Sequence, residues 1–570
     1  RPAGGDGMMA IRRFLGWFLV LAALWSLPGC AALPAVVGLR ATPSRTPFRP
    51  VPNTPTPSPS PTPTDTPTPI PSPTPQVIGF WAADGTPDGL KAAVTLPAGW
   101  EWVESPEQAA VKLEPVTDTS LPPITWVYAL AAPFPTVLDG VSLQDLQRAW
   151  RGESHQPFDG KPLLLSQDTL RVFTAAWGEP RGDVSAVDAD GLVQAAWDSR
   201  TWCLVPFERL EPRLKVLRVD GSSPLARGDL QAYPLRLGFR LTAGMQSPDA
   251  FQQAGGSLPA GNRDPSKMTV ILMTGTTALV RATAWRMEGL GLSYPARDIM
   301  DWLQEPDFTH ISNEASFNPA CPKADPNQTS LMFCSRPEYI QLLDAIGADI
   351  IELSGNHNND WGRDAFDYSL ELFRQRGWRW FAGGENSQEA EKPLLLEHNG
   401  NRIAFVGCNL AGPPAAWATD TLPGAARCDL DAYAAKLGDL RAQGYLPVMT
   451  FQYNEIYVPY PSERQEVDFR RMADAGAVIV SGSQAHFPQG FAFESGELIH
   501  YGLGNLFFDQ MDVPVVGTRR EFLDRHVFYN GRHISTELLT AMLEDYARPR
   551  PMTEEERAAF LAEIFAATGW

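Results

Sequence analysis

Residues 348–362 have the sequence ADIIELSGNHNNDWG, and this stretch decides the fold that we predict for most of the chain. It predicts a buried strand that ends in a polar loop. The same arrangement recurs in TVILMTG at 269–275, NRIAFVGCN at 401–409, LPVMTFQYNE at 446–455, AVIVSGSQAH at 477–486 and ELIHYGLGN at 497–505. Because loops at strand ends present polar side chains from a rigid base, these six ends predict one shared cleft in an α/β (α+β) domain.

The front of the chain predicts export. Arg12 and Arg13 precede an apolar run at 14–25, and Leu-Pro-Gly-Cys at 27–30 closes the segment, which is typical of a signal peptide. This ending resembles a bacterial lipobox, so residues 1–30 are expected to be a signal segment with lipid on Cys30. The folded part is then extracytoplasmic and anchored to the membrane. A plain signal peptide that is cut elsewhere is the alternative.

Composition divides the rest of the 570 residues, of which 44% are hydrophobic and 20% are charged. Residues 31–76 predict a tether, since proline, threonine and serine dominate from position 41 and favour an extended conformation. Residues 77–244 predict a smaller α/β domain, with a strand at 124–134 and a helix capped by Ser142. Residues 245–267, rich in Gly, Pro and Ser, predict a linker to a last domain at 268–570 that has a C-terminal helical extension.

Two features of composition bear on partners and compartment. The formal net charge of −19 argues against nucleic acid as a partner, because nucleic acid is itself anionic. The close cysteine pairs Cys321/Cys334 and Cys408/Cys428 are candidate disulfides in an exported chain, each contributing about 3 kcal/mol. Cys203, in an apolar run, is expected to be a buried thiol.

Two resemblances to known families follow from longer phrases. In the upstream domain, TVLDGVSLQDLQRAWRGE at 136–153 resembles the solute-binding proteins of phosphate-type transport systems. In the last domain, the ordered blocks HISNEASF at 310–317, SGNHNNDWG at 354–362, VSGSQAHFPQGF at 480–491 and YGLGNLFFDQ at 501–510 resemble the CapA family of poly-gamma-glutamate capsule synthesis proteins. That resemblance implies a calcineurin-like metallophosphoesterase fold, a sandwich of two sheets flanked by helices.

The CapA resemblance also implies a site. In that fold, Asp, Asn and His side chains hold divalent metals, which activate water and stabilise charge on a phosphoryl or acyl oxygen. By motif, the implied metal ligands are Glu314, Asn356, His357 and His486, and the implied catalytic residues are His357, Asp360 and His486. The remaining residues of the implied pocket are Thr276, Asn313, Gln452, Glu455, Gln484 and Asn505, with Asp509 in the closing phrase.

Three of these positions depart from the family pattern. Thr276 stands where the family has aspartate, and Gln452 and Gln484 stand where it has histidine. Neutral donors bind divalent ions more weakly than carboxylate or imidazole. We therefore expect a degenerate site, compatible with one weakly held divalent ion. Five other histidines are expected to be structural or on the surface: His310, His398, His500, His526 and His533.

Three functions remain open at this point. The leading hypothesis is a surface lipoprotein that acts in the biosynthesis, retention or handling of an extracellular polymer such as poly-gamma-glutamate, with the polymer or its precursor as partner. The first alternative is an active metal-dependent hydrolase of phosphoester or amide bonds. The second is a solute-binding lipoprotein whose upstream domain captures an anion.

Overall fold

The structure is a computed structural model that describes residues 77–116, 124–153, 156–158, 160–228 and 230–570. The predicted signal segment with Cys30 and the predicted tether of residues 31–76 lie outside the described residues. The described residues fall within one compact unit, Pro73–Trp570. No helix in this described part is long and apolar enough to cross a lipid bilayer.

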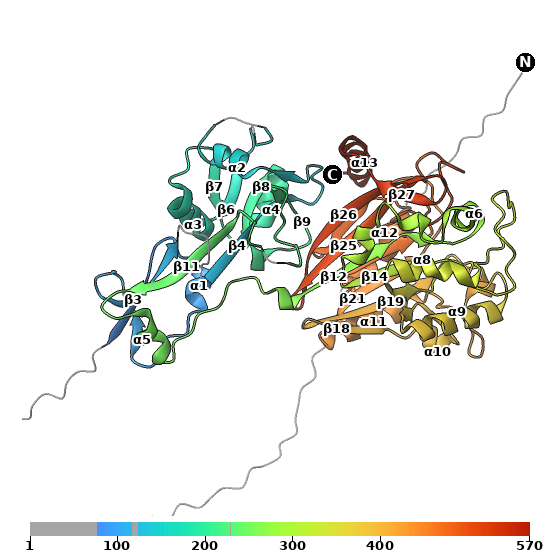
Figure 1. The fold of residues 1–570 in the computed structure, drawn as a ribbon, viewed down its shortest axis with the longest axis horizontal. Coiled ribbons are helices and arrows are strands. Elements are labelled where there is room, and N and C mark those ends of the chain that lie inside the picture. The colour runs from blue at the N-terminus through green and yellow to red at the C-terminus, as the bar shows by residue number, and fades with distance from the viewer. Residues whose placement is uncertain (1–76, 117–123, 154–155, 159, 229) are drawn as a thin grey trace, which may run out of the picture. The chain divides into compact units, whose positions relative to one another are not determined.

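The upstream part of the chain is built on a nine-stranded mixed sheet (Figure 1). Its strands, in spatial order, are β2 (Trp100–Trp102), β1 (Ile78–Ala82), β3 (Ala109–Val116), β11 (Arg236–Ala243), β4 (Ile124–Pro133), β8 (Trp202–Pro206), β6 (Leu163–Ser166) and β7 (Val184–Val187), with β9 (Leu214–Val216) beside β4. A separate pair is formed by β5 (Gly140–Val141) and β10 (Arg218–Val219). The helices are α1 (Asp88–Ala92), α2 (Leu143–Trp150), α3 (Gln167–Trp177), α4 (Leu192–Ser199) and α5 (Pro248–Gln253).

Helices cover both faces of this sheet because side chains alternate along each strand. Leu165 of β6 belongs to the same buried cluster as Phe173 of α3. Its neighbour Leu164 packs with Leu192 of α4 in a second cluster. Ser142 caps α2, as predicted, by accepting a hydrogen bond from the backbone N–H of Asp145. The predicted α/β class is therefore confirmed for this part of the chain.

The segment predicted as a linker is partly folded. Residues 248–253 form α5, and the Phe251 ring lies 4.8 Å from the Phe80 ring and 5.5 Å from the Trp100 ring, measured between centroids. Farther along, Asn262 Oδ1 accepts a hydrogen bond of 2.8 Å from the backbone N–H of Val127. Residues within 248–262 thus pack on the upstream part, and the domain boundary at 245–267 stays a prediction.

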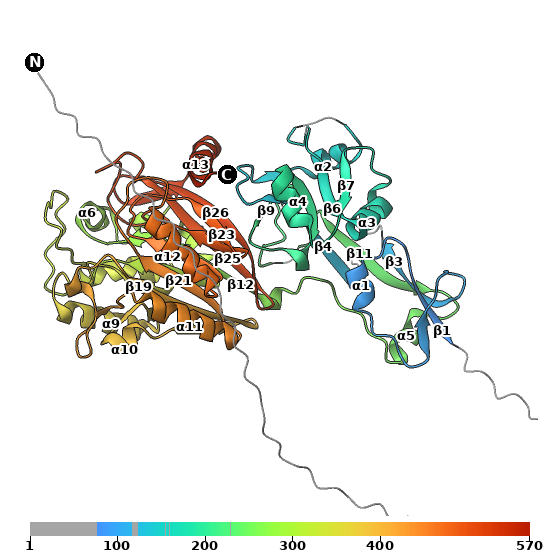
Figure 2. The ribbon, with the colours of Figure 1, turned by 180° about the vertical axis from the view of Figure 1, so that it is seen from behind.

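The downstream part is a sandwich of two sheets, as predicted (Figures 1 and 2). The first sheet has the order β16 (Arg379–Phe381), β15 (Ala348–Glu352), β14 (Phe308–Asn313), β12 (Met268–Thr274), β25 (Arg520–Tyr529), β26 (Arg532–Glu544) and β27 (Arg548–Pro551), with β13 (Thr276–Thr277) beside β14. The second has the order β18 (Leu394–His398), β19 (Asn401–Asn409), β21 (Leu446–Gln452), β22 (Ile479–Ser483), β24 (Glu497–His500) and β23 (Phe491–Glu494). A small pair is formed by β17 (Gly383–Gly384) and β20 (Gly424–Ala425).

The core of this sandwich lies between the sheets, and helices cover the outer faces. Ile271 of β12 packs inward with Phe405 of the second sheet, whereas Leu272 faces the helices on the other side. One outer face is covered by α6 (Arg281–Leu290), α7 (Met300–Gln304), α8 (Ile340–Ala345) and α9 (Arg363–Arg376). The other is covered by α11 (Leu430–Ala442) and α12 (Glu463–Asp474), which Figure 2 shows over β19 and β21. The short α10 (Ser387–Ala390) and the C-terminal α13 (Glu554–Thr568) complete the helices.

All six predicted strands of this part exist, and parallel pairing sets their ends together. β12, β14 and β15 are parallel neighbours in the first sheet, and β19, β21, β22 and β24 are parallel neighbours in the second. The carboxyl ends of parallel neighbours lie at the same edge of a sheet. The loops that follow these strands therefore converge at one edge of each sheet.

The cysteines pair as predicted in the described residues. Cys321 and Cys334 form one disulfide with their Cα atoms 5.9 Å apart, and Cys408 and Cys428 form another at 5.0 Å. Cys203 is a buried free thiol, and burial raises its pKa to about 12. A thiol that resists ionisation in this way is a packing residue and not a nucleophile.

Candidate functional site

The predicted site residues come from six strand ends. Thr276 lies in β13 just after β12, and Gln452 is the last residue of β21. The others follow strands directly: Glu314 after β14, Asn356 and His357 after β15, Gln484 and His486 after β22, and Asn505 after β24. Short bridges tie the loops together, between Ala315 and His357 and between Thr276 and Asn505.

The side-chain amide of Gln452 lies at the centre of this group. Its Nε2 donates to Glu314 Oε1 at 3.3 Å and to Asn356 Oδ1 at 3.0 Å, and it also donates to Gln484 Oε1. Its Oε1 accepts a hydrogen bond of 2.6 Å from the Ser483 hydroxyl. Three side-chain oxygens from three different loops thus face one uncharged N–H₂ group.

His486 lies beside this group on a bent loop. Its Nδ1 is 2.8 Å from Asn505 Oδ1, and its Nε2 is 3.8 Å from Glu314 Oε1. Gln484 and His486 both have left-handed backbone conformations, with φ of 76° and 52°. Non-glycine residues adopt such conformations at a cost, and they cluster at sites where the side chain must point in one direction.

His357 is held by the carboxylate of Asp360. His357 Nδ1 and Asp360 Oδ2 are 2.7 Å apart, and the same oxygen accepts a 2.7 Å hydrogen bond from the backbone N–H of Phe333. Burial acts to lower the pKa of His357, but the bond to Asp360 and the charge of Glu314 outweigh it, so its pKa is raised above the usual value. Protonated His357 is therefore favoured relative to a free histidine.

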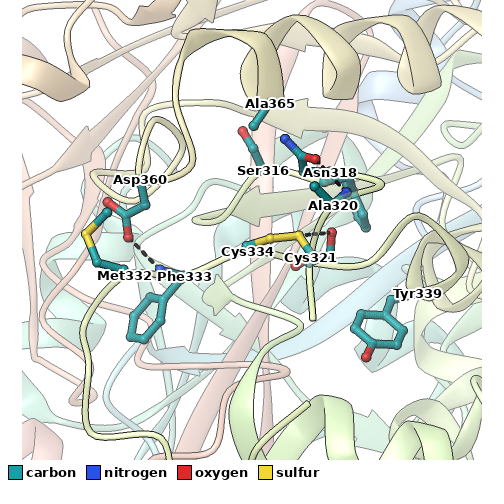
Figure 3. The surroundings of a disulfide bond; sticks show 12 residues. Ser316, Asn318, Ala320, Cys321, Met332, Phe333, Cys334, Tyr339, Asp360 and Ala365 are labelled. Atoms are coloured by element: carbon teal, nitrogen blue, oxygen red, sulfur yellow. Dashed lines mark hydrogen bonds between the residues drawn. A yellow bond between two sulfur atoms is a disulfide. The ribbon is translucent and has the colours of Figure 1, made fainter. Parts of the chain in front are cut away.

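Phe333 precedes Cys334, one of the two cysteines of a disulfide. Figure 3 shows Cys334 joined to Cys321 beside the hydrogen bond between Phe333 and Asp360. The Phe333 ring lies 4.4 Å from the His357 ring, measured between centroids. The disulfide loop thus forms one wall around the His357–Asp360 pair, a connection that the sequence analysis did not foresee.

Two buried oxygens at the site have no hydrogen-bond partner among the described residues, Thr276 Oγ1 and Glu314 Oε2. The backbone of Thr276 is by contrast well held, since its N–H donates to the Gly504 carbonyl at 3.1 Å. Two such unpartnered polar atoms, on neighbouring segments, mark a place where a ligand, a water molecule or an ion could bind.

Other predicted residues lie at the edge of the site. Asn313 braces the loop, with its Nδ2 donating to Asn358 Oδ1 at 3.2 Å. Glu455 is exposed and accepts a hydrogen bond from the Tyr457 hydroxyl. Asp509 forms an ion pair with Arg281.

The sequence did not predict two residues that lie next to the site, Asn358 and Arg281. Asn358 is fully buried and bridges the loops after β14 and β15, and the Asn-rich loop was its only signal. Arg281 has a left-handed φ of 46°, and its guanidinium lies 4.9 Å from the Phe333 ring and 5.0 Å from the Phe508 ring. Nothing in the local sequence of Arg281 indicated this position.

The histidines expected to be structural are paired within the fold. His310 Nε2 lies 3.1 Å from Glu352, and His500 Nδ1 lies 2.6 Å from Asp524, all four side chains being buried. Burial lowers the pKa of His533 to about 4 and that of His526 well below its usual value. His398 Nδ1 lies 3.1 Å from the Thr269 hydroxyl. His526 and His533 both lie within hydrogen-bond distance of the Thr536 hydroxyl, so each of the five has a structural partner.

The donor types at the site are mostly neutral. Glu314 and His486 supply a carboxylate and an imidazole, and Gln452, Asn356 and Gln484 supply amides. Within the described part of the chain, no three His, Cys, Asp or Glu side chains come close enough together to hold a metal ion.

Comparison with known proteins shows a family that the downstream part resembles. Residues 270–510 match the family described as bacterial capsule synthesis protein PGA_cap. The chain is 26% identical over 264 residues to the capsule biosynthesis protein CapA of Bacillus anthracis, which covers 44% of this chain and 62% of that protein. It is 25% identical over 174 residues to the PGA biosynthesis protein CapA of Bacillus subtilis (strain 168), covering 30% of this chain and 46% of that protein. The predicted resemblance to the CapA family is thus confirmed for this part.

Two solved structures with similar folds cover different shares of the chain. The 5'-nucleotidase precursor from Thermus thermophilus is 12% identical with a TM-score of 0.31, over 53% of this chain and 59% of that chain. An ABC-type phosphate transport receptor from Vibrio cholerae is 11% identical with a TM-score of 0.20, over 26% of this chain and 80% of that chain.

Proposed function

We propose that this protein acts in the biosynthesis, retention or handling of an extracellular capsule-type polymer, and that its site binds the polymer or its precursor without a strongly held metal. The match of residues 270–510 to capsule synthesis proteins supports the process. The chain spans less than two thirds of the two curated relatives, so their whole activity is not carried over. The position of the Gln452 amide supports binding without a strongly held metal.

The Gln452 amide takes the place in which a cation would be expected. A divalent metal binds where several oxygens point at one centre and where carboxylate or imidazole supplies charge. Here three oxygens point at one N–H₂ group, and only Glu314 among them carries charge. Thr276 and Gln484 offer no charge either. The residues present therefore do not fit a pair of divalent metals.

Such a site can still bind an oxygen-rich chain. Protonated His357 can donate a hydrogen bond to a carbonyl, carboxylate or phosphate oxygen, because the Asp360 carboxylate favours its charged form. The Thr276 hydroxyl and the free oxygen of Glu314 add one donor and one acceptor. These groups are suited to holding a polymer end or a precursor in one orientation.

A metal-dependent hydrolase is the second candidate, and the same free oxygen of Glu314 favours it. His486 Nε2 and Glu314 Oε1 are 3.8 Å apart and form no hydrogen bond with each other, and Glu314 Oε2 has no partner among the described residues. If the Gln452 side chain rotated away, one divalent ion could bind between these two side chains. Metal analysis of the purified full chain separates the candidates. Two tightly bound metals per chain, with turnover lost in His357→Ala, would establish the hydrolase.

We further propose that the protein works outside the cytoplasmic membrane, held there by lipid on Cys30. The lipobox-like ending supports the anchor. Two disulfides support an oxidising compartment, since reduced cysteines are the rule in the cytoplasm.

The test of function is made in the source bacterium. Cells from which the gene is deleted should carry less polymer on their surface, and the wild-type gene should restore it. His357→Ala should restore it poorly, because the donor to the polymer is lost. His398→Ala is the matched control, since that histidine lies outside the site and should restore polymer fully. Unchanged surface polymer after deletion would contradict the proposal.

A further inference from the structure

A groove of about 620 Å³ opens next to the site, and no predicted role accounts for it. Its walls come from the start of α6, the loop closed by the Cys321–Cys334 disulfide, the loop after β21 and residues 509–514. This volume lies in the range of pockets that hold small molecules.

The groove lies beside the site. Glu455 and Tyr457 line it, and the Tyr457 hydroxyl donates a hydrogen bond to Glu455, one of the predicted pocket residues. Arg281 also lines it, with its guanidinium 4.9 Å from the Phe333 ring and 5.0 Å from the Phe508 ring. Those rings in turn contact His357 and His486, at centroid distances of 4.4 and 5.3 Å.

The charges in the groove do not suit a polyanion. Arg281 is paired with Asp509, and Arg286 is paired with Asp545. Glu455 adds a further carboxylate, which accepts a hydrogen bond from the uncharged Tyr457 hydroxyl. An acidic chain would meet two arginines that are already paired and the carboxylates of Asp509 and Glu455, in a protein whose formal net charge is already −19.

The uncharged surface of the groove has two kinds of group. Trp285 is 43% exposed and Tyr546 is 41% exposed, so both rings offer aromatic surface to a ligand, although the Arg286 guanidinium lies 4.7 Å from the Trp285 ring on one side. Asn327 and Gln510 add planar amides, a group that can both donate and accept hydrogen bonds. A sugar ring has an apolar C–H face that packs on aromatic rings, and hydroxyl groups around its rim that pair with amides.

We infer that this groove binds an uncharged saccharide chain. The inference rests on the proposed function, because it names the chemical class of the polymer or precursor that would enter the site. Aromatic faces beside arginines that are already paired distinguish this groove from a site for poly-gamma-glutamate, which needs unpaired positive charge.

The test is isothermal titration calorimetry on the purified full chain. The probes are cellohexaose, maltohexaose and chitohexaose, which are uncharged, and a polyglutamate oligomer of similar length. At least one hexasaccharide should bind more tightly than polyglutamate. Trp285→Ala should weaken that binding by about ten-fold or more, as for a central aromatic anchor. Trp102→Ala is the matched control, since Trp102 is 42% exposed but lies in the upstream part, and it should bind like wild type.

A second variant guards against misfolding of the first. Tyr546→Asn keeps a residue that tolerates the left-handed φ of 60° and removes the other aromatic face, so it should also weaken binding. The inference is overturned if none of the three hexasaccharides binds, or if polyglutamate binds more tightly and depends on Trp285. If gene deletion reduces the surface polymer but no saccharide binds, the saccharide inference is contradicted and the proposed function is not. If a saccharide binds but gene deletion leaves the surface polymer unchanged, the proposed function is contradicted.

Discussion

Replacement of Gln452 by alanine tests whether its amide stands in for a cation. The change removes the donor to Glu314, Asn356 and Gln484 and leaves the Glu314 carboxylate buried without this partner. The two amide hydrogens serve one charged and one neutral acceptor at a time, and the amide oxygen also accepts a hydrogen bond from the Ser483 hydroxyl. With about 2 kcal/mol for the bond to a charged group and about 1 kcal/mol for each neutral bond, we expect a loss of about 4 kcal/mol in the free energy of unfolding. Chemical denaturation of the full chain measures it.

The decisive part is the response of this variant to metal. With the amide gone, Mn²⁺ can enter among the freed oxygens, and at ten times its Kd it should return about 1.4 kcal/mol of stability. Gln465→Ala is the matched control, because Gln465 is equally buried but its Nε2 donates to Gln489 and to the Tyr501 carbonyl, with no carboxylate. It should lose stability and show no response to Mn²⁺.

Two results would refute this reasoning. Equal stabilisation of wild type and Gln452→Ala by Mn²⁺ would mean that a metal already binds beside the amide. A loss below about 1 kcal/mol would mean that the three hydrogen bonds matter little. The converse variant combines Thr276→Asp, Gln452→His and Gln484→His and should raise metal affinity, because each change restores a charged or imidazole ligand on a scaffold that already directs the side chain inward.

Three further predictions concern other parts of the chain. Burial raises the pKa of Glu521 well above its usual value, so the folded state keeps a proton that the unfolded state releases. The free energy of unfolding of the wild type relative to Glu521→Met should therefore fall, by up to about 1.4 kcal/mol per pH unit, as the pH rises above the unfolded pKa, since the buried histidines act equally in both proteins; chemical denaturation at a series of pH values measures this difference, and a difference that does not change with pH would refute it. Cys334→Ser removes the Cys321–Cys334 disulfide and should cost about 3 kcal/mol, seen as a lower Tm; an unchanged Tm would show that the disulfide does not constrain the chain. Cys30→Ser should release the protein from membranes in fractionation, and full retention would count against the lipobox.

Sequence by itself was enough for the layout of the downstream part. Each of the six strands is encoded by apolar residues within a few positions of one another, and a polar loop follows each. The ordered blocks then indicated the family, and the replaced residues Thr276, Gln452 and Gln484 were visible without any structure. The close cysteine pairs also followed from spacing and compartment alone.

The contacts of the segment at 245–267 could not be predicted in the same way. The turn-rich composition of residues 245–267 indicated a linker, yet Phe251 packs beside Phe80 and Trp100. The composition of a segment indicates its local conformational preference. Burial of one ring depends instead on a surface that residues far earlier in the chain supply.

Only the tertiary structure decided which side chains meet. Gln452 and Glu314 are 138 positions apart, and Arg281 and Asp509 are 228 apart, so no local pattern couples them. The parallel register of the strands brings their ends to one edge, and left-handed turns at Gln484 and His486 aim the side chains. The sequence therefore determined which chemical groups stand at the strand ends, and the packing of distant segments determined that the Gln452 amide lies among oxygens from three other loops.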